Sequence, residues 1–319
     1  MNEFELINYI KSKQKIKRKD VIVGILDDAA IVNPPDNKKI AISTDTLLEG
    51  VHFQKYDPPE LISYKAIAVN LSDMAAIGAD PAWITLSLTI PEIKTNFIKK
   101  FTRGLFNISE KFSLEIIGGD ICRGPFSITI QIQGFVKPEK YLLRKGAKFK
   151  DDIYVSGSLG KAAIYFFLTN KQYKKISSSI FLSSRLKYFK PKPRINLGKK
   201  LIGIANSAID ISDGLSGDLQ HILNCSNVGA NIFMENIPIA SDLNIFTKKE
   251  AMEIAISGGE DYELCFTAPS SKRRIIKKLS KTLKIPIIKI GEIISELKTN
   301  FLFKGYPFEF KKYSYQHFY

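Results

Sequence analysis

Residues 208–222, AIDISDGLSGDLQHI, join an apolar strand to a helix through a cluster of polar side chains. Two isoleucines alternate with Asp210 and Ser212, which is the period of a strand with one buried face. Asp213 follows, and Gly214 begins a helix whose N-terminus favours nearby anions. Two carboxylates and a hydroxyl this close together destabilise a fold unless a cation lies between them. The junction therefore predicts a cation site where a strand meets a helix.

A second stretch with strand character also mixes hydroxyl and carboxylate side chains. Residues 40–48 read IAISTDTLL, and the period of two places Ser43 and Asp45 on one face and Thr44 on the other. Strand-like and helix-like segments alternate over the first ~140 residues, and the alternating strands are typical of a mixed or antiparallel sheet. Residues 142–152 resemble a connector, after which strands and helices alternate again.

Three further aspartates lie at strand ends or on a helix face. Asp28 follows an apolar stretch, and Asp73 interrupts the apolar stripe of a helix predicted over 60–77. Asp120 ends a strand predicted over 114–120, before a short loop. Each acid alone is explained as well by helix capping. Together with the Ser and Thr hydroxyls they suit Mg²⁺, which proteins hold with one or two carboxylates plus substrate phosphates. The set predicts a polyphosphate ligand.

The sequence lacks the common phosphate-binding motifs. The P-loop and protein-kinase signatures are missing, and no GxGxxG follows a predicted strand. Two Gly-Gly pairs stand directly before Asp120 and Glu260, where backbone N–H groups can approach an anion, although a lone Gly pair is also an ordinary turn signal. Arg144 is a candidate for neutralising phosphate charge. If the chain handles ATP, we expect it to do so through metal ions.

The composition limits the remaining function classes. The chain has 319 residues, enough for two domains, and a net charge of +15. Dispersed lysines explain this charge better than nucleic-acid binding, because no basic run contains interleaved aromatic residues. No apolar run is long enough to span a membrane and no signal peptide is recognisable, so we expect a cytoplasmic protein with no membrane partner. Three scattered cysteines predict buried, reduced thiols.

Several motifs, taken in order, resemble one known family. They are GILDDAA (24–30), AISTDTLLEGVHF (41–53), YKAIAVNLSDMAAIGADPAW (64–83), IIGGDICRGP (116–125), LLRKGAKFKDDIYVSGSLG (142–160), ANSAIDISDGLSGDLQHI (205–222), ISGGEDYELCFT (256–267) and SYQHF (314–318). They span nearly the whole chain and are similar to thiamine-monophosphate kinases, of the superfamily that includes aminoimidazole ribonucleotide synthetase and selenophosphate synthetase.

The resemblance implies direct in-line, Mg²⁺-dependent transfer of the γ-phosphoryl group of ATP to thiamine monophosphate, the last step of thiamine diphosphate biosynthesis, with no residue acting as a general base. It implies an α/β fold of the α+β type with two domains. Residues 1–140 would bind ATP and metal and form the core of a homodimer around a mixed sheet. Residues 141–319 would form an α/β sandwich that completes the active site.

The same resemblance assigns roles to individual residues. The implied magnesium ligands are Asp28, Ser43, Thr44, Asp45, Asp73, Asp120, Asp210 and Asp213. The implied ATP contacts are Gly119, Asp120, Arg144 and Ser212. The implied substrate contacts are His52, Glu260 and Tyr315, of which the last two suit the cationic ring of thiamine.

Two departures from the family pattern and two alternative functions accompany this interpretation. Leu26 stands where the family usually has Gly before the Asp pair, and Ser314 stands where it often has Gly before the last aromatic residue. One alternative is a sister enzyme that activates another acceptor, but selenophosphate synthetases usually carry an N-terminal Cys or selenocysteine, and this chain has no Cys before Cys122. The other is a non-enzymatic RNA binder, for which salt-dependent binding would be diagnostic.

Overall fold

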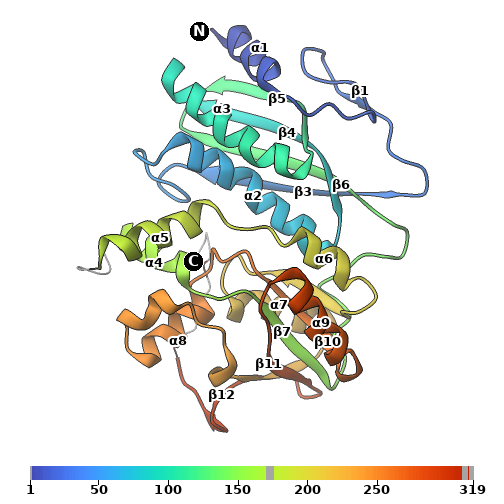
Figure 1. The fold of residues 1–319 in the computed structure, drawn as a ribbon, viewed down its shortest axis with the longest axis vertical. Coiled ribbons are helices and arrows are strands. Elements are labelled where there is room, and N and C mark those ends of the chain that lie inside the picture. The colour runs from blue at the N-terminus through green and yellow to red at the C-terminus, as the bar shows by residue number, and fades with distance from the viewer. Residues whose placement is uncertain (1, 170–175, 311–314, 316–319) are drawn as a thin grey trace. The chain divides into compact units, whose positions relative to one another are not determined.

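The structure is a computed structural model that describes residues 2–169, 176–310 and 315. The chain divides into two compact units. The first unit comprises residues 1–74 and 79–139, and the second comprises residues 75–78 and 140–319. Each unit combines a mixed β-sheet with helices (Figure 1), which confirms the predicted α/β class.

The first unit is built on a four-stranded sheet in the order β3-β6-β4-β5. Its strands are β3 (Lys39–Leu48), β4 (Asp80–Ile90), β5 (Glu115–Arg123) and β6 (Ser127–Val136). β4 and β5 run parallel, whereas β6 pairs antiparallel with both β3 and β4. The sheet is therefore mixed, as predicted. β5 continues through Cys122 and Arg123, where the sequence suggests a loop, because its parallel pairing with β4 extends to Ile90.

Two helices, α2 (Pro59–Ile77) and α3 (Thr95–Ser109), cover one face of this sheet (Figure 1). The alternation along β3 explains why: Ala41 and Leu47 are buried on the helix side, while Ile42 on the other side is exposed. The two helices approach closely at Gly104, where a Cβ atom would lie 2.1 Å from the carbonyl oxygen of Glu60. The remaining elements of this unit are α1 (Glu3–Lys13), β1 (Val21–Val23), β2 (Ile31–Val32) and the short 3₁₀ helix η1 (Glu110–Phe112).

The second unit contains a seven-stranded sheet in the order β13-β12-β9-β11-β7-β10-β8. Its strands are β7 (Asp151–Ser156), β8 (Ser207–Asp210), β9 (Gly229–Phe233), β10 (Leu264–Pro269), β11 (Ile287–Ile294), β12 (Thr299–Phe303) and β13 (Tyr306–Pro307). β12 pairs parallel with β9, and the other neighbouring strands pair antiparallel.

Helices accompany this second sheet, and α4, α7 and α8 contribute buried side chains to its apolar core. They are α4 (Lys161–Thr169), α5 (Ser178–Phe189), α6 (Ile195–Leu201), α7 (Leu215–Ser226), α8 (Lys248–Ser257) and α9 (Arg273–Leu283), with the 3₁₀ helices η2 (Met234–Asn236), η3 (Ser241–Ile245) and η4 (Ser270–Lys272). Leu215, Leu219 and Ile222 form the buried stripe of α7. They join Ile153 and Val155 of β7 in one core cluster.

The strand before α7 differs from the sequence prediction in two ways. All four residues of β8 are buried, not only one face, and the strand ends at Asp210 so that Ser212 does not share a strand face with it. The ladder with β10 stops at the pair Asp210–Leu264. Beyond it, the backbone turns away and forms hydrogen bonds with another loop. The strand end and helix start are placed as predicted, but a bend separates them.

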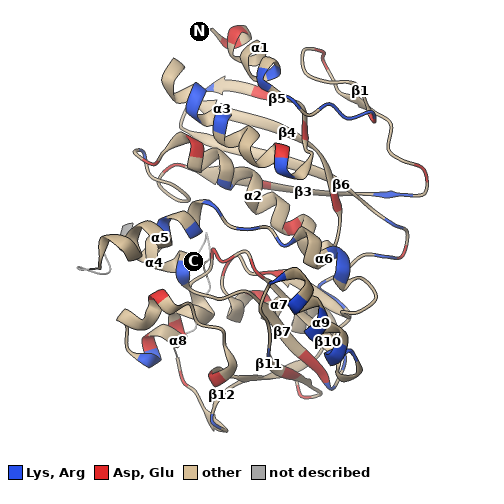
Figure 2. Cartoon of the chain, in the orientation of Figure 1, with Lys and Arg blue, Asp and Glu red and all other residues tan. Residues whose placement is uncertain are grey.

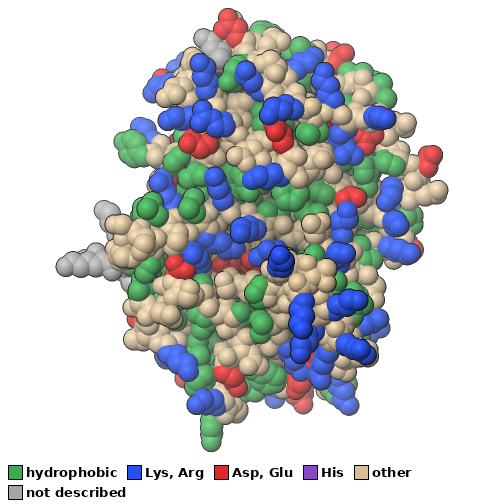
Figure 3. All heavy atoms as spheres, in the orientation of Figure 1, with side chains coloured by type: hydrophobic (Ala, Val, Ile, Leu, Met, Phe, Trp, Pro, Cys, Tyr) green, Lys and Arg blue, Asp and Glu red, His purple; other side chains and the backbone are tan. Residues whose placement is uncertain are grey.

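Positive charge is distributed over both units. Figure 2 shows Lys and Arg on most helices, with the densest run on α9. Figure 3 shows that on the visible face these side chains are mostly dispersed among uncharged ones, apart from the group over α9. In the described parts of the chain, no helix combines the length and apolar character that crossing a membrane requires.

Candidate active site

In the first unit, the structure brings Ser43 and Asp73 together. Ser43 lies on the helix-facing side of β3, and its hydroxyl donates a hydrogen bond to Oδ2 of Asp73 on α2, at 2.5 Å. Asp45 is two residues further along the same face of β3 and is half-buried. The predicted interruption of the α2 stripe by Asp73 therefore has a physical reason: its carboxylate faces the polar part of the strand beside it.

The sheet places Thr44 and Asp120 on the opposite face. Thr44 is exposed and lies between Ser43 and Asp45. Asp120 pairs in register with Ser87 of β4, which pairs with Thr129 of β6 and through it with Thr46. Residues in register share a face, so Asp120 belongs to the same face as Thr44. The side chains of the implied magnesium ligands in this unit are thus divided between the two faces of one sheet.

Asp28 lies in the loop between β1 and β2. Its side chain is exposed, and its backbone N–H donates to Oδ1 of Asp27 at 2.9 Å. Leu26, at the position where the family usually has Gly, adopts φ = +90° and is 54% exposed. A left-handed backbone at a leucine costs about 1–3 kcal/mol. The departure noted in the sequence therefore strains the turn that carries both acids.

His52 lies in the turn after β3 and is committed to local hydrogen bonds. Its Nδ1 accepts from the backbone N–H of Leu48 at 3.0 Å, and its own backbone N–H donates to the Leu48 carbonyl at 2.9 Å. Acceptance at Nδ1 places the proton of the neutral imidazole on Nε2. The structure thus gives His52 a turn-stabilising role, which is compatible with the substrate contact that the family resemblance implies.

In the second unit, the loop 211–214 folds around a carboxylate that the sequence analysis did not single out. Oδ2 of Asp218, in the first turn of α7, accepts hydrogen bonds from the backbone N–H groups of Ser212, Asp213 and Gly214, at 3.0, 3.1 and 3.2 Å. Asp218 is only 3% exposed. Burial, followed by the negative charges of Asp210 and Asp213, raises its pKa well above the ordinary value. The available signal was an Asp four residues after the helix-opening Gly.

This arrangement changes the role expected of the α7 N-terminus. The amide groups that would otherwise attract an external anion already bind Asp218. Asp210, at the end of β8, and Asp213, in the loop, add two negative charges close to Asp218. Such a negative site fits a hard cation better than a phosphate.

The loop 258–263 pairs with loop 211–214 through its backbone. The N–H of Glu260 donates to the Ser212 carbonyl at 2.7 Å, and the N–H of Tyr262 donates to the Ile211 carbonyl at 2.8 Å. Gly259 lies so close that a Cβ atom would be 2.6 Å from the Ser212 oxygen. Glu260 is thereby held next to the loop that carries Ser212 and Asp213.

Tyr315 reaches the same region of the second unit. Its backbone N–H donates to the Asp213 carbonyl at 3.3 Å, and its ring contacts Phe166 of α4 edge-on, with ring centroids 6.4 Å apart. The structure thus brings together Ser212, Asp213, Glu260 and Tyr315, which were predicted separately as nucleotide, metal and substrate residues. Ser314, the second departure from the family pattern, lies outside the described residues.

The other two implied ATP contacts have simpler settings. Arg144 is exposed, and its backbone carbonyl accepts a hydrogen bond from Ser226 at 3.4 Å. Gly119 lies against β4, where a Cβ atom would come 1.9 Å from the carbonyl oxygen of Leu86. A side chain at position 119 would therefore push the two strands apart, so the Gly before Asp120 has a packing role as well.

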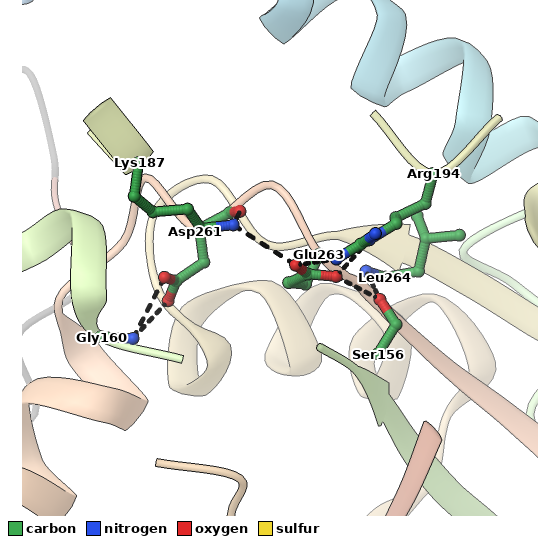
Figure 4. A network of polar contacts seen from close by, with 7 residues as sticks. All are labelled: Ser156, Gly160, Lys187, Arg194, Asp261, Glu263 and Leu264. Atoms are coloured by element: carbon green, nitrogen blue, oxygen red, sulfur yellow. Dashed lines mark hydrogen bonds and ion pairs between the residues drawn. The ribbon is translucent and has the colours of Figure 1, made fainter. Parts of the chain in front are cut away.

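A buried charge network includes Asp261 and Glu263 of loop 258–263 (Figure 4). Both carboxylate oxygens of Glu263 are bound by the Arg194 guanidinium, at 2.5 and 2.6 Å. Ser156 donates to the same carboxylate at 2.7 Å, and Lys187 lies 3.3 Å from it. Asp261 accepts the Gly160 N–H at 2.9 Å, and burial raises the pKa of its carboxyl group to about 7. None of these residues was a sequence-predicted site residue.

The donor chemistry of both units fits Mg²⁺ bound with the help of a phosphorylated ligand. Within the described residues, no three His, Cys, Asp or Glu side chains are arranged to hold a metal ion by themselves. Mg²⁺ does not require such a cage, because it commonly takes one or two carboxylates, waters and substrate phosphates. Ser43 donates its proton to Asp73, which leaves the lone pairs of its oxygen available to a cation.

Comparison with known proteins defines first the class and then the particular family. Residues 26–136 match the AIR synthase related protein N-terminal domain, and residues 151–303 match the corresponding C-terminal domain. The chain is therefore a member of the AIR synthase related proteins. Within this class it belongs to the thiamine-monophosphate kinase family, which confirms the resemblance found in its motifs.

The relatives that show this cover the whole chain. It is 45% identical to thiamine-monophosphate kinase of Buchnera aphidicola subsp. Schizaphis graminum, with 99% of both chains covered. It is 42% identical to the Escherichia coli enzyme of the same name, with 99% of this chain and 98% of that one covered.

Two solved structures support the same assignment. A crystal structure of thiamine-monophosphate kinase from Stenotrophomonas maltophilia superposes with a TM-score of 0.87 at 37% identity, covering 96% of this chain and 98% of that one. AaThiL complexed with AMPPCP and TMP superposes with a TM-score of 0.76 at 29% identity, covering 99% and 97%.

Proposed function

We propose that this protein transfers the γ-phosphoryl group of ATP to thiamine monophosphate, yielding thiamine diphosphate and ADP. The observation that carries the proposal is the similarity to thiamine-monophosphate kinases over 99% of the chain. The related AaThiL structure, which holds AMPPCP and TMP, supports ATP and thiamine monophosphate as the two substrates.

The proposed magnesium ligands come from both units. They are Asp28, Ser43, Thr44, Asp45, Asp73, Asp120, Asp210 and Asp213, while ATP contacts Gly119, Asp120, Arg144 and Ser212. The Ser43–Asp73 hydrogen bond and the negative loop around Asp213 support this set. Mg²⁺, when bound, neutralises phosphate charge and aligns the two phosphorylated molecules.

The reaction proposed is a direct in-line transfer. The nucleophile is a phosphate oxygen of thiamine monophosphate, which is already anionic and needs no general base. The work of the chain is then positioning: Asp73 orients the Ser43 hydroxyl, and Asp218 fixes the backbone of Ser212 and Asp213. Positioning of this kind accounts for a large part of the rate enhancement in phosphoryl transfer.

Glu260 and Tyr315 are the proposed contacts for the cationic ring of thiamine, with His52 as a third substrate contact. A carboxylate supplies charge complementarity, and an aromatic face attracts a cation. The support is that Glu260 and Tyr315 are both tied by their backbones to loop 211–214. Tyr315→Ala is expected to raise the KM for thiamine monophosphate, whereas Tyr315→Phe retains the aromatic face and a near-normal KM.

We further propose a homodimer formed through the sheets of the first units. Ile40, Ile42 and Leu48 project from the exposed face of β3, which is also the edge strand of its sheet. An exposed apolar edge strand is a typical pairing surface. Ile42→Lys is expected to shift the sedimentation equilibrium toward monomer. Ile275→Lys on α9, which replaces an exposed isoleucine of the second unit, is the matched control.

A cytoplasmic location is also proposed. Its support is chemical: none of the three cysteines forms a disulfide. Only Cys265 is buried, so the expectation of three buried thiols was wrong for Cys122 and Cys225. Cys122 lies on the uncovered face of β5, and Cys225 lies near the C-terminal end of α7, outside its buried stripe.

The decisive experiment measures ADP release by the purified protein with thiamine monophosphate, and with thiamine and an aminoimidazole precursor as control acceptors. We expect turnover with thiamine monophosphate alone. Asp73→Asn should abolish most of it at saturating Mg²⁺, whereas Asp36→Asn, at an exposed turn, should leave it unchanged. Turnover with thiamine or the aminoimidazole compound, or a fully active Asp73→Asn variant, would contradict the proposal.

A further inference from the structure

The segment that follows Glu260 and leads into β10 is held by side-chain contacts from several other parts of the second unit. Glu263 precedes β10, and its carboxylate is bound by Ser156 at the end of β7, by Lys187 on α5 and by Arg194 before α6 (Figure 4). The backbone there is already bonded, since the carbonyl of Glu263 accepts the N–H of Ile211 at 2.8 Å. The side-chain contacts are therefore additional to the sheet itself.

Asp261 adds a second anchor two residues before. Its carboxylate accepts the Gly160 N–H at the start of α4, and its backbone carbonyl accepts from Nζ of Lys187 at 2.8 Å. Lys187 thus joins the backbone of Asp261 to the carboxylate of Glu263. Both acids are almost fully buried, so neither is placed to meet a ligand in solvent.

The anchored residues alternate with strained ones. Glu260 has φ = +61° and Tyr262 has φ = +50°, and neither is a glycine. Side-chain-bearing residues leave the left-handed region unless their surroundings hold them there. Asp261 follows Glu260 directly, and Asp261 and Glu263 flank Tyr262, so the network anchors the backbone next to both strained residues.

A buried ion pair is a weak explanation of stability alone, because apolar residues of the same volume often stabilise a core as well or better. A buried ion pair does, however, restrict the backbone around it to one conformation. We propose that Asp261 and Glu263 are positioning residues that hold loop 258–263 in its left-handed conformation so that Glu260 meets the cationic ring of thiamine monophosphate. This inference rests on the substrate contact proposed for Glu260.

The network should affect the two substrates unequally. The backbone of Ser212, a proposed ATP contact, is held by Asp218, whereas the strained backbone at Glu260 is held by the network in addition to its hydrogen bond with Ser212. Glu263→Gln keeps the side-chain shape but removes the charge that pairs with Arg194. Its KM for thiamine monophosphate is expected to rise about tenfold or more, with the KM for ATP within about twofold of the wild type. Ser156→Ala removes one hydrogen bond and should raise the first KM about threefold.

Asp152→Asn is the matched control. Asp152 is a buried acid on the same sheet that pairs with Arg273 and Lys289, at 2.5 Å each, and does not belong to the network around Glu263. The Asp152→Asn variant should have a lower melting temperature, as we also expect for Glu263→Gln, but both of its KM values should be unchanged. A purely structural role would instead move melting temperature without separating the two KM values.

The outcomes separate the two hypotheses. A folded Glu263→Gln variant whose KM for thiamine monophosphate stays within twofold of the wild type overturns the positioning role, and so does an equal shift in Asp152→Asn. If Glu263→Gln does not fold, the same criteria apply to Ser156→Ala. A wild-type protein that turns over no thiamine monophosphate overturns the proposed function and, with it, the role given to Glu260.

Discussion

Two loops of this protein carry acids in left-handed turns, and they are supported very differently. In the first unit, Leu26 adopts φ = +90° just before Asp27 and Asp28, and the hydrogen bond there is the local one between these two acids. In the second unit, Glu260 and Tyr262 also have positive φ angles. Their turn is hydrogen-bonded to loop 211–214 through the backbone and is held by the buried network around Glu263.

The difference indicates two ways of presenting charge to a ligand. Loop 258–263 is preorganised: the side chains of Ser156, Lys187 and Arg194 and the backbone N–H of Gly160 set its geometry before any ligand arrives. The acids of the loop that carries Asp28 are exposed and share a local hydrogen bond, so we expect a ligand to define their geometry. Substitutions that remove supporting contacts should therefore have a large effect on loop 258–263 and a small effect on the loop that carries Asp28.

The largest expected effect comes from removing Arg194, one of the two cations that bind Glu263. Arg194→Met leaves the buried Glu263 carboxylate without its bidentate partner and should lower the free energy of unfolding by about 3–5 kcal/mol. Asp27→Asn in the exposed loop should change it by no more than about 0.5 kcal/mol. Urea titration of both variants is the measurement, and equal losses would remove the distinction between the loops.

The next effect is a pH dependence that only the clamped loop should show. Burial raises the pKa of Asp261 from 3.8 to about 7, so the folded protein favours the neutral acid. This stabilisation is present below the unfolded pKa and is lost as the pH rises through about 7. Asp261→Asn stays neutral, so its stability relative to wild type should improve by about 2–3 kcal/mol between pH 5 and pH 8. A constant difference across this range would contradict the buried-acid assignment.

A third comparison concerns the proposed metal ligands of the two units. Asp210→Asn replaces a buried carboxylate at the end of strand β8 and should reduce kcat about 100-fold at saturating Mg²⁺. Asp28→Asn acts on an exposed loop, so we expect a weaker apparent Mg²⁺ affinity and a kcat that recovers as Mg²⁺ is raised. Mg²⁺ titrations of ADP release check both; recovery of Asp210→Asn by Mg²⁺ would reverse the assignment.

The smallest effect is the removal of strain at Leu26. Leu26→Gly permits φ = +90° without steric conflict and should stabilise the protein by about 1 kcal/mol, after allowing for the greater freedom of Gly in the unfolded chain. Asn37→Gly is the control, because Asn37 is also left-handed but Asn tolerates that region. Unfolding midpoints in urea suffice, and a destabilised Leu26→Gly variant would contradict the strain.

The periodicity of the sequence correctly predicted features that depend on neighbouring residues. The period of two in β3 correctly separated Ser43 and Asp45 from Thr44, and the helical stripe located α2. The family motifs led to the residues that meet at loop 211–214, namely Ser212, Asp213, Glu260 and Tyr315.

Features that depend on distant residues were missed. Arg194 and Glu263 are separated by 69 positions, and neither shows a periodicity that points to the other. The extension of β5 through Arg123 depends on parallel pairing with β4, and the early end of β8 depends on the bonds its following loop makes elsewhere. In each case tertiary hydrogen bonding, not local propensity, decided the outcome.

Asp218 has a consequence for inhibitor design. The N-terminus of a helix beside an active-site loop commonly binds phosphonates and other phosphate mimics. Here the carboxyl group of Asp218 already occupies that position and accepts hydrogen bonds from three backbone N–H groups. Compounds aimed at the second unit should therefore gain affinity through a cationic group directed at Asp213, or through chelation of the Mg²⁺ proposed there, and gain nothing from an added phosphate mimic at this helix.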